Sequence, residues 1–313
     1  MSATTIQEAA VPGAPTPAQA PAVALPPSST FLKRFARNPT AMVSACILLV
    51  IVLAAVLAPY IAPFDPAKSS LRAILRPPWW LSWKPGTPVY WLGTDDLGRD
   101  VASRLIHASR LSLVASVQAV SIALVLGLPP GLIAGYVGGW TDTVLSRITD
   151  AIMSFPALIL AVVIVGLLGP SLTNAMTAIG IVYAPRIMRV VRGSTLSVRE
   201  EVYIRAARAT GCGDARIITR HVLPNVMGPL VVQATVLMGQ ALLAEAGLSF
   251  LGLGTQPPLA SWGAMLGTAF PYMAQSPVPT IAAGVIISVT VLCFNLIGDG
   301  IRDSVGRMRR AGD

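Results

Sequence analysis

Charged residues are scarce in this sequence, and their scarcity excludes most soluble folds. Only 12% of the 313 residues are Asp, Glu, Lys or Arg, whereas 54% are apolar. A soluble domain usually carries about 25% charged residues, because polar side chains must cover the surface that faces water. Lipid must therefore cover much of this chain, and we expect a membrane protein with several spans.

Cysteine and histidine are also rare, which argues against a disulfide framework and a metal centre. Cys46, Cys212 and Cys293 lie far apart and lack CxxC or metal-ligand spacing, and His107 and His221 are isolated. The phosphate-binding GxxxxGK[ST] pattern and the HExxH and GxSxG catalytic patterns are missing as well. We therefore expect no metal, no cofactor bound by this chain and no catalytic residue.

The formal net charge of +9 allows two interpretations. A basic chain can bind nucleic acid, but aromatic residues make up only 6% here and no nucleic-acid motif is present. The basic residues instead lie in short stretches between apolar runs, as the positive-inside bias of membrane proteins predicts. We expect a lipid membrane, and no nucleic acid, as a partner.

Six apolar runs predict six transmembrane helices, at about residues 41–62, 111–136, 151–168, 172–188, 226–248 and 280–297. Arginine and lysine cluster before the first run, at 186–220 and after 301, whereas 169–185 and 249–301 contain none. This distribution predicts that both termini are cytoplasmic. Glycines and prolines at 127–135 indicate a kink or a close helix contact in the second run. The stretch between the last two runs is expected to enter the membrane edge without crossing.

These runs divide the chain into four regions. Residues 1–30 are rich in Ala, Pro, Ser and Thr and are expected to form a disordered tail, not a signal peptide. Residues 31–108 are expected to hold the first helix and a long outer loop. A five-helix core follows at 109–305, with a cytoplasmic loop at 196–225, and residues 306–313 are expected to be a cytoplasmic tail.

The long basic loop between the fourth and fifth runs predicts two short helices. One face of the first helix carries Val202, Ala206 and Ala209. Gly211 and Gly213 can end this helix, Asp214 can cap the second one, and Pro224 can stop the second helix at the membrane. A solvated amphipathic loop at the membrane surface explains these residues about equally well.

The spacing of Ala206-Ala207, Gly211 and Leu223-Pro224 resembles the EAA loop of bacterial ABC importer permeases. The resemblance implies that small side chains here seat closely in a groove of a partner ATPase. Arg205 stands where many members carry glutamate and His221 where they often carry isoleucine, and these departures favour the peptide branch of the family. The residues expected to couple to the ATPase are Tyr203, Arg205, Ala206, Ala207, Arg208, Gly211, Leu223 and Pro224.

A second motif precedes the second run. It resembles the GTD..GRD signature of the dipeptide, oligopeptide and nickel permeases, and comprises Gly93, Thr94, Asp95, Gly98, Arg99 and Asp100. A Gly/Asp turn with local ion pairs is the simpler interpretation. We expect a structural role, or contact with an extracytoplasmic binding protein, over substrate chemistry. Similar stretches at 134–142, 245–263 and 295–303 extend the likeness over about residues 31–305, and the pattern is that of the second of two permeases.

Two polar residues of the fifth run are pathway candidates. Glu245 lies at the edge of the run, where a carboxylate is costly. Either Glu245 lines a pathway or gate, or it forms hydrogen bonds to the backbone of the Gly-rich stretch that follows. The sequence does not distinguish these two roles. Gln240 is the second candidate, although amides within spans more often join helices. The same two interpretations apply to Gln118, Asn174, Gln233 and Asn295.

The resemblance implies an all-α membrane protein with six transmembrane helices, the permease subunit of an ATP-binding-cassette importer for di- or oligopeptides. Its implied partners are a homologous second permease in a heterodimer, two ATPase subunits that bind ATP and Mg, and an extracytoplasmic substrate-binding protein. Its implied location is the bacterial cytoplasmic membrane. Nickel chelate, glutathione or a haem-like ligand are alternative cargoes. A secondary transporter would be expected to show an inverted repeat and ionisable residues at mid-membrane, and a membrane enzyme would need catalytic groups.

Overall fold

The computed structural model describes residues 35–82, 85 and 88–310. Every regular element within these residues is a helix, which confirms the all-α expectation. The tail expected at residues 1–30 lies outside the described residues. The last helix, α13 (Pro277–Arg310), extends well into the tail expected at 306–313, so that region begins as helix.

Within the described residues, four helices are long and apolar enough to cross a bilayer. They are α2 (Pro39–Val56), α5 (Val101–Val137), α11 (Leu223–Phe250) with the helical turns before it, and α13. The pair α6 (Gly139–Met153) and α7 (Ala157–Leu168) meets the same criteria only when taken together, which gives up to five spans. α8 (Leu172–Arg199) is long enough, but polar residues that include four arginines lower its hydropathy. The count of six spans therefore stays a prediction, with α8 as the remaining helix.

The third expected span, at 151–168, is not a single helix. α6 and α7 meet at 88°, and Ser154, Phe155 and Pro156 separate them. Proline lacks the N–H that an interior helical position needs and disfavours the helical conformation of the residue before it. α7 is about 18 Å long at 1.5 Å per residue, which is too short for a hydrocarbon layer of about 30 Å. This part of the chain is a broken span or a re-entrant loop.

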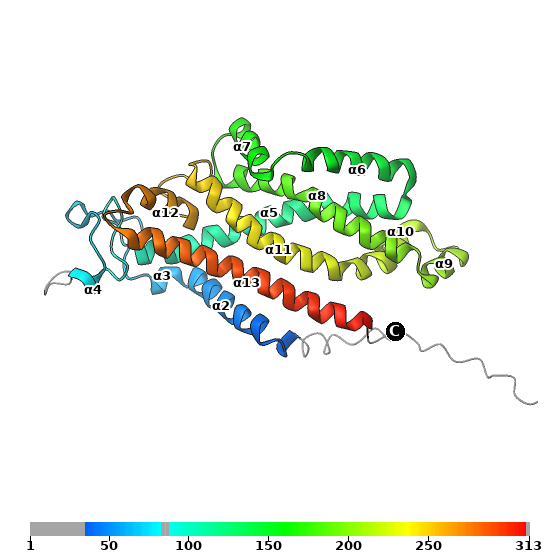
Figure 1. Ribbon diagram of the computed structural model, residues 1–313, viewed down its shortest axis with the longest axis horizontal. Helices are drawn as coiled ribbons and strands as arrows, with labels where there is room; N and C mark the ends of the chain where they lie inside the picture. Colours follow the sequence, from blue (N-terminus) through cyan, green and yellow to red (C-terminus); the bar gives the residue numbers. More distant parts are fainter. Residues whose placement is uncertain (1–34, 83–84, 86–87, 311–313) are drawn as a thin grey trace, which may run out of the picture.

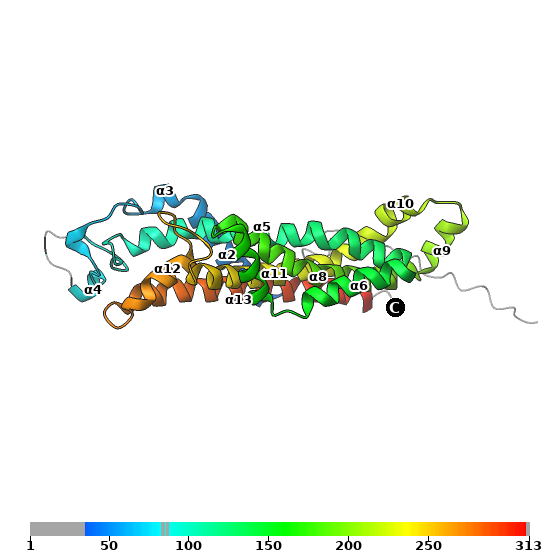
Figure 2. The same cartoon turned by 90° about the horizontal axis from the view of Figure 1, so that it is seen from above.

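The long helices run along a common axis, α7 lies across them near the middle, and the other short elements lie at the two ends (Figure 1). One end carries α3 (Ala58–Ile61), η1 (Leu71–Ala73), α4 (Trp79–Ser82), α12 (Trp262–Ala269) and η3 (Phe270–Tyr272). The opposite end carries α9 (Val202–Ala209) and α10 (Asp214–Ile217), and Figure 2 shows the same separation from above. The start of α2 and the end of α13 point toward the α9–α10 end.

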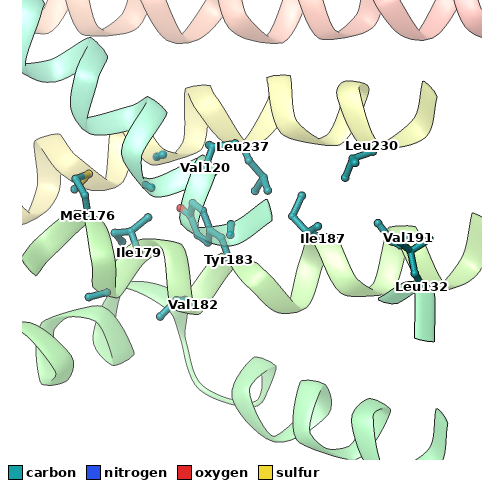
Figure 3. Packing of buried hydrophobic residues seen from close by; sticks show 14 of the residues in the cluster. Val120, Leu132, Met176, Ile179, Val182, Tyr183, Ile187, Val191, Leu230 and Leu237 are labelled. Carbon is teal, nitrogen blue, oxygen red and sulfur yellow. The ribbon is translucent and has the colours of Figure 1, made fainter. Parts of the chain in front are cut away.

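α5 and α8 form the centre of the bundle because glycines let their backbones approach closely. A Cβ added to Gly127 would lie 2.5 Å from the carbonyl oxygen of Ala184, and one added to Gly131 would lie 2.8 Å from that of Met188. Four-residue spacing of small residues is typical of membrane helix contacts. α5 stays helical through 127–135, so the close contact expected there is confirmed. Tyr183, Ile187, Val191 and Leu237 fill the adjoining core (Figure 3).

Candidate functional site

The segment between α8 and α11, here called the coupling segment (residues 199–225), folds as two short helical pieces with a sharp break. α9 ends at Ala209, and Gly211, directly after the C-cap Thr210, has a φ of +81°, in the left-handed region that glycine adopts without strain. The Cys212 N–H then bonds the Ala207 carbonyl at 3.1 Å and closes the turn. The expectation that Gly211 ends the first helix is confirmed.

Two expectations for the second helix are wrong. The N-cap of α10 is Gly213, not Asp214, and it has no side-chain cap bond. The Asp214 carboxylate instead accepts a hydrogen bond from the Tyr136 hydroxyl at 2.6 Å. Pro224 does not stop the helix either, because it lies at the start of α11, directly after the π-helical turn η2 (Ile218–Val222). The wider π turn and the first helical turn both tolerate a missing N–H, so α10, η2 and α11 run on as one helix.

α9 turns one residue inward and most of the others outward. Ile204 is fully buried, and Ala207 is half-buried against the same core. Val202, Ala206 and Ala209, the residues expected on one face, are all exposed, with Val202 at 70%. A small-residue helical face at the end of a membrane bundle is available for close contact with another protein.

The coupling-segment residues expected from the sequence lie together at this end of the molecule (Figure 1). Tyr203 and Arg205 are exposed, and the Tyr203 ring lies 6.5 Å from that of His221. At the far end of the segment Leu223 is half-buried and Pro224 is exposed.

A buried tyrosine of α5 fixes the coupling segment to the bundle, and sequence reasoning missed it. The Tyr136 hydroxyl donates to Asp214 of α10 and accepts from the Nε of Arg208 of α9 at 3.3 Å. The Arg208 guanidinium also lies 4.9 Å from the centre of the Tyr136 ring. Arg199, at the end of α8, donates to the Tyr136 carbonyl at 3.2 Å. Tyr136, Arg199, Arg208 and Asp214, here called the Tyr136 anchor, therefore join α5, α8, α9 and α10.

The outer signature residues lie at the opposite end and turn inward. Thr94 is fully buried, where its hydroxyl donates to the Ala73 carbonyl and accepts from the Arg76 N–H at 2.8 Å. Asp95 accepts from the Arg99 Nε at 2.7 Å and lies 3.4 Å from the Arg104 Nε. These bonds hold the loop onto the start of α5.

Glycine and aspartate complete this outer loop. Gly93 and Gly98 have φ of +80° and +70°, and a Cβ on Gly98 would lie 2.0 Å from the Ser70 carbonyl oxygen. Asp100 caps α5 by accepting from the Ser103 N–H at 2.7 Å, and burial raises the pKa of its carboxyl above the usual value. Such bonding supports a structural role for the signature.

Glu245 is fully buried among serines. Its carboxylate accepts from the Ser249 hydroxyl at 2.7 Å and from the Ser112 hydroxyl at 3.3 Å. Ser112 in turn accepts from the Trp262 N–H at 3.1 Å, and Ser249 accepts from the Thr255 N–H at 3.1 Å. The carboxylate thus joins α5, α11 and α12 and, through Ser249, the Gly-rich stretch. This geometry supports the bonding interpretation over a gate.

Gln240 has a different environment. Its side-chain oxygen accepts a hydrogen bond from the Arg186 guanidinium of α8, and its carbonyl accepts from the Tyr183 hydroxyl at 3.3 Å. The structure does not bring Gln240 and Glu245 into one polar cluster, because each has its own partners. The Gln118 side-chain amide donates a hydrogen bond to the Thr173 carbonyl at 3.3 Å and so joins α5 to α8, as expected of amides within spans.

Comparison with known proteins finds two family models that match this chain. Residues 127–309 match the family described as binding-protein-dependent transport system inner membrane component, and residues 27–78 match the N-terminal TM domain of oligopeptide transport permease C. The chain is 41% identical over 290 residues to a di/tripeptide transport system permease protein of Pseudomonas aeruginosa, covering 92% of this chain and 95% of the relative.

Two further similarities place the chain more broadly. It is 41% identical over 216 residues to a glutathione transport system permease protein of Pectobacterium atrosepticum, covering 69% of this chain and 72% of the relative. The fold is similar to a chain of the inward-facing MetNI methionine ABC transporter, with a TM-score of 0.53 and 21% identity over 66% of this chain and 95% of that one. Since one family model covers more than half of the sequence, the chain belongs to the binding-protein-dependent inner membrane permeases.

Proposed function

We propose that this chain forms, with a homologous second permease, the membrane pathway of an importer for di- or oligopeptides. The coupling segment carries the proposal, because it presents a small-residue face outward, is bonded to α5 and continues into a membrane-spanning helix. Relatives named for di/tripeptide transport support the peptide cargo. A relative named for glutathione transport makes glutathione, itself a short peptide, the second candidate.

In this proposal two ATPase subunits bind ATP and Mg, and α9 docks in a groove of one of them. The Lys and Arg distribution supports a cytoplasmic position for the coupling segment and both termini. A substrate-binding protein delivers cargo at the opposite end, which carries the outer loop. We also infer that residues 31–108 act as an accessory region and 109–305 as the pathway core.

Energy transfer requires that nucleotide favours one state of the ATPases over the other. Closure of the ATPases moves α9, and the Tyr136 anchor passes this displacement to α5 and α8. The uninterrupted helix from α10 to α11 passes it to the fifth span. A path of hydrogen bonds and continuous helix is stiff, so a shift at one end is not lost by local bending.

Reconstitution in proteoliposomes tests the proposal. A tagged chain should co-purify with a second permease and an ATPase, and the assembled complex with its receptor should accumulate labelled dipeptide only when ATP is supplied to the ATPase side. Uptake by this chain without an ATPase would contradict the proposal and favour a secondary transporter. Accumulation of nickel chelate instead of peptide would retain the architecture and change the cargo.

A further inference from the structure

α8 carries four arginines, and three of them have carboxylate partners. Arg189 lies 2.9 Å from Asp150, Arg192 forms a two-point ion pair with Asp142 that includes an Nη2–Oδ2 distance of 2.7 Å, and Arg199 lies 3.1 Å from Glu200. The fourth, Arg186, has no carboxylate within 4.0 Å among the described residues. It is also the arginine of α8 nearest to the outer end of the bundle.

Arg186 lies at the middle of its helix. At 1.5 Å per residue it is roughly 20 Å from Leu172 and roughly 20 Å from Arg199. The helix is longer than a hydrocarbon layer of about 30 Å, and the apolar run at 172–188 places Arg186 near the coupling-side end of that layer. An arginine within the end of a span is a functional candidate, because a partly buried cation needs a compensating anion or water.

The protein holds the Arg186 guanidinium in place without neutralising it. Its Nη1 donates to the side-chain oxygen of Gln240, and its Cζ lies 5.0 Å from the centre of the Tyr183 ring. A guanidinium has five N–H donors, and among the described residues only this one bond is formed. The side chain is half-buried, so part of it faces outward from this chain. A planar fork with free donors is the geometry that binds a carboxylate at two points.

Resting on the proposed function, we propose that Arg186, supported by Gln240 and Tyr183, is a binding site for the carboxylate of a peptide in transit. Every cargo in the proposed class carries at least one carboxylate. Gln240 lies on α11, which is continuous with the coupling segment, whereas Arg186 lies on α8. Relative motion of α8 and α11 therefore changes the bonding of the guanidinium. A site for a transported ligand needs such a state-dependent affinity, whereas a permanent ion pair with a second permease does not.

The test compares two peptides and three variants. Proteoliposomes containing the complete transporter take up Ala-Ala or Ala-Ala amide, each at a concentration that saturates the receptor. The acid-to-amide ratio of uptake rates is measured for the wild type, Arg186→Gln and Arg186→Lys. Arg189→Gln serves as the matched control, because Arg189 is on the same helix, is exposed and already has a carboxylate partner. The preference of the receptor is the same for all variants and cancels when their ratios are compared.

We expect Arg186→Gln to lower the acid-to-amide ratio about tenfold or more, because a charge-assisted hydrogen bond is lost. Arg186→Lys should lower the ratio less, and Arg189→Gln should leave it unchanged. An equal reduction for both peptides, or no reduction, would overturn the proposal. If the second permease no longer co-purified with Arg186→Gln, the proposal would also be overturned. The carboxylate that neutralises Arg186 would then belong to that subunit and not to the cargo.

A second measurement does not depend on the receptor. Equilibrium binding of labelled Ala-Ala to the detergent-solubilised permease and ATPase complex should weaken about tenfold in Arg186→Gln and stay the same in Arg189→Gln. Equal binding to both variants would reject the carboxylate site even where uptake of the amide is too slow to measure. A wild-type complex that transports neither peptide would instead contradict the proposed function and its cargo.

Discussion

Single residues hold the two ends of this protein in place, because other residue types could not adopt their conformation or make their bonds. Gly98 at the outer end and Tyr136 at the coupling end are the clearest cases. Gly98 has a positive φ, and the Ser70 carbonyl oxygen occupies the space that a Cβ would need. The buried Tyr136 hydroxyl has hydrogen-bond partners on two helices of the coupling segment.

Gly98→Ala should destabilise the protein more than Gly252→Ala. Both glycines have similar φ, of +70° and +77°, but a Cβ at Gly98 would lie 2.0 Å from the Ser70 carbonyl oxygen, whereas nothing lies within 4 Å of one at Gly252. Left-handed strain alone costs about 1 kcal/mol, and the clash at Gly98 should add about 1–3 kcal/mol. Thermal unfolding of the purified protein in detergent measures the difference. Equal melting temperatures for the two variants would mean that the outer loop is not packed as described.

Tyr136→Phe should loosen the coupling segment while leaving the bundle folded. The change removes a hydrogen bond to Asp214 and one from Arg208, and we expect a loss of about 1 kcal/mol because Asp214 is exposed to water. Uptake should fall more than ATP hydrolysis, since energy transfer through the anchor is impaired. Tyr60→Phe is the matched control, because Tyr60 is 88% exposed at the other end. Unchanged uptake per ATP in Tyr136→Phe would remove the anchor from the mechanism.

At the scale of helices, α9 is the element on which the proposed docking of the ATPase depends. Ala206 is exposed on its small-residue face, so Ala206→Trp should leave folding and membrane insertion intact and prevent close seating of a partner. Co-purification of the ATPase should be lost together with uptake. Ala67→Trp is the control, because Ala67 is an exposed alanine at the opposite end. An Ala206→Trp protein that retains the ATPase would show that this face is not the docking face.

Ala207→Glu and Gly211→Trp should also abolish transport without preventing insertion. Ala207 is half-buried against the core, so a carboxylate there would be forced outward or would displace α9. Gly211 has a φ of +81°, so a bulky residue there is strained as well as large. Membrane fractionation and uptake check both changes. Normal transport by either variant would contradict the assignment of the coupling segment.

The sequence predicts the presence of the helices better than it predicts where each helix begins and ends. Composition and apolar runs are enough to predict long helices, and Gly211 is enough to predict the end of α9. The break at Pro156 also had a local signal, which the apolar run on both sides obscured. Asp214 looks like a helix cap in the sequence because its partner, Tyr136, lies 78 positions away, and no local pattern reveals such a pair. Pro224 looks like a helix stop in the sequence because no local pattern reveals the π turn that precedes it.

The pathway residues were the least predictable part of the site. The sequence does not assign a role to Glu245, because its serine partners, Ser112 and Ser249, come from two different helices. The sequence does not distinguish Arg186 from the other arginines of α8, because the difference lies in which of them face Asp142 and Asp150 on α6. Such distinctions depend on helix packing, which the order of residues along one chain does not specify.

At the scale of the whole molecule, the two ends of the bundle have different chemistry. One end carries the basic, helical coupling segment, and the other carries the outer loop with its tryptophans and the α12 region (Figure 1). The account requires that the membrane separates these ends and that the coupling end faces the ATPases. Every other inference about energy transfer depends on this orientation.

Cysteine labelling of intact cells and inverted membrane vesicles tests the orientation directly. In a cysteine-free background without the ATPases, Arg205→Cys, at an exposed position of α9, should react with a membrane-impermeant maleimide only in inverted vesicles. Ala67→Cys, at an exposed position of the outer loop, should react only when applied from outside the cell. Labelling of Arg205→Cys from the outer side would contradict the account.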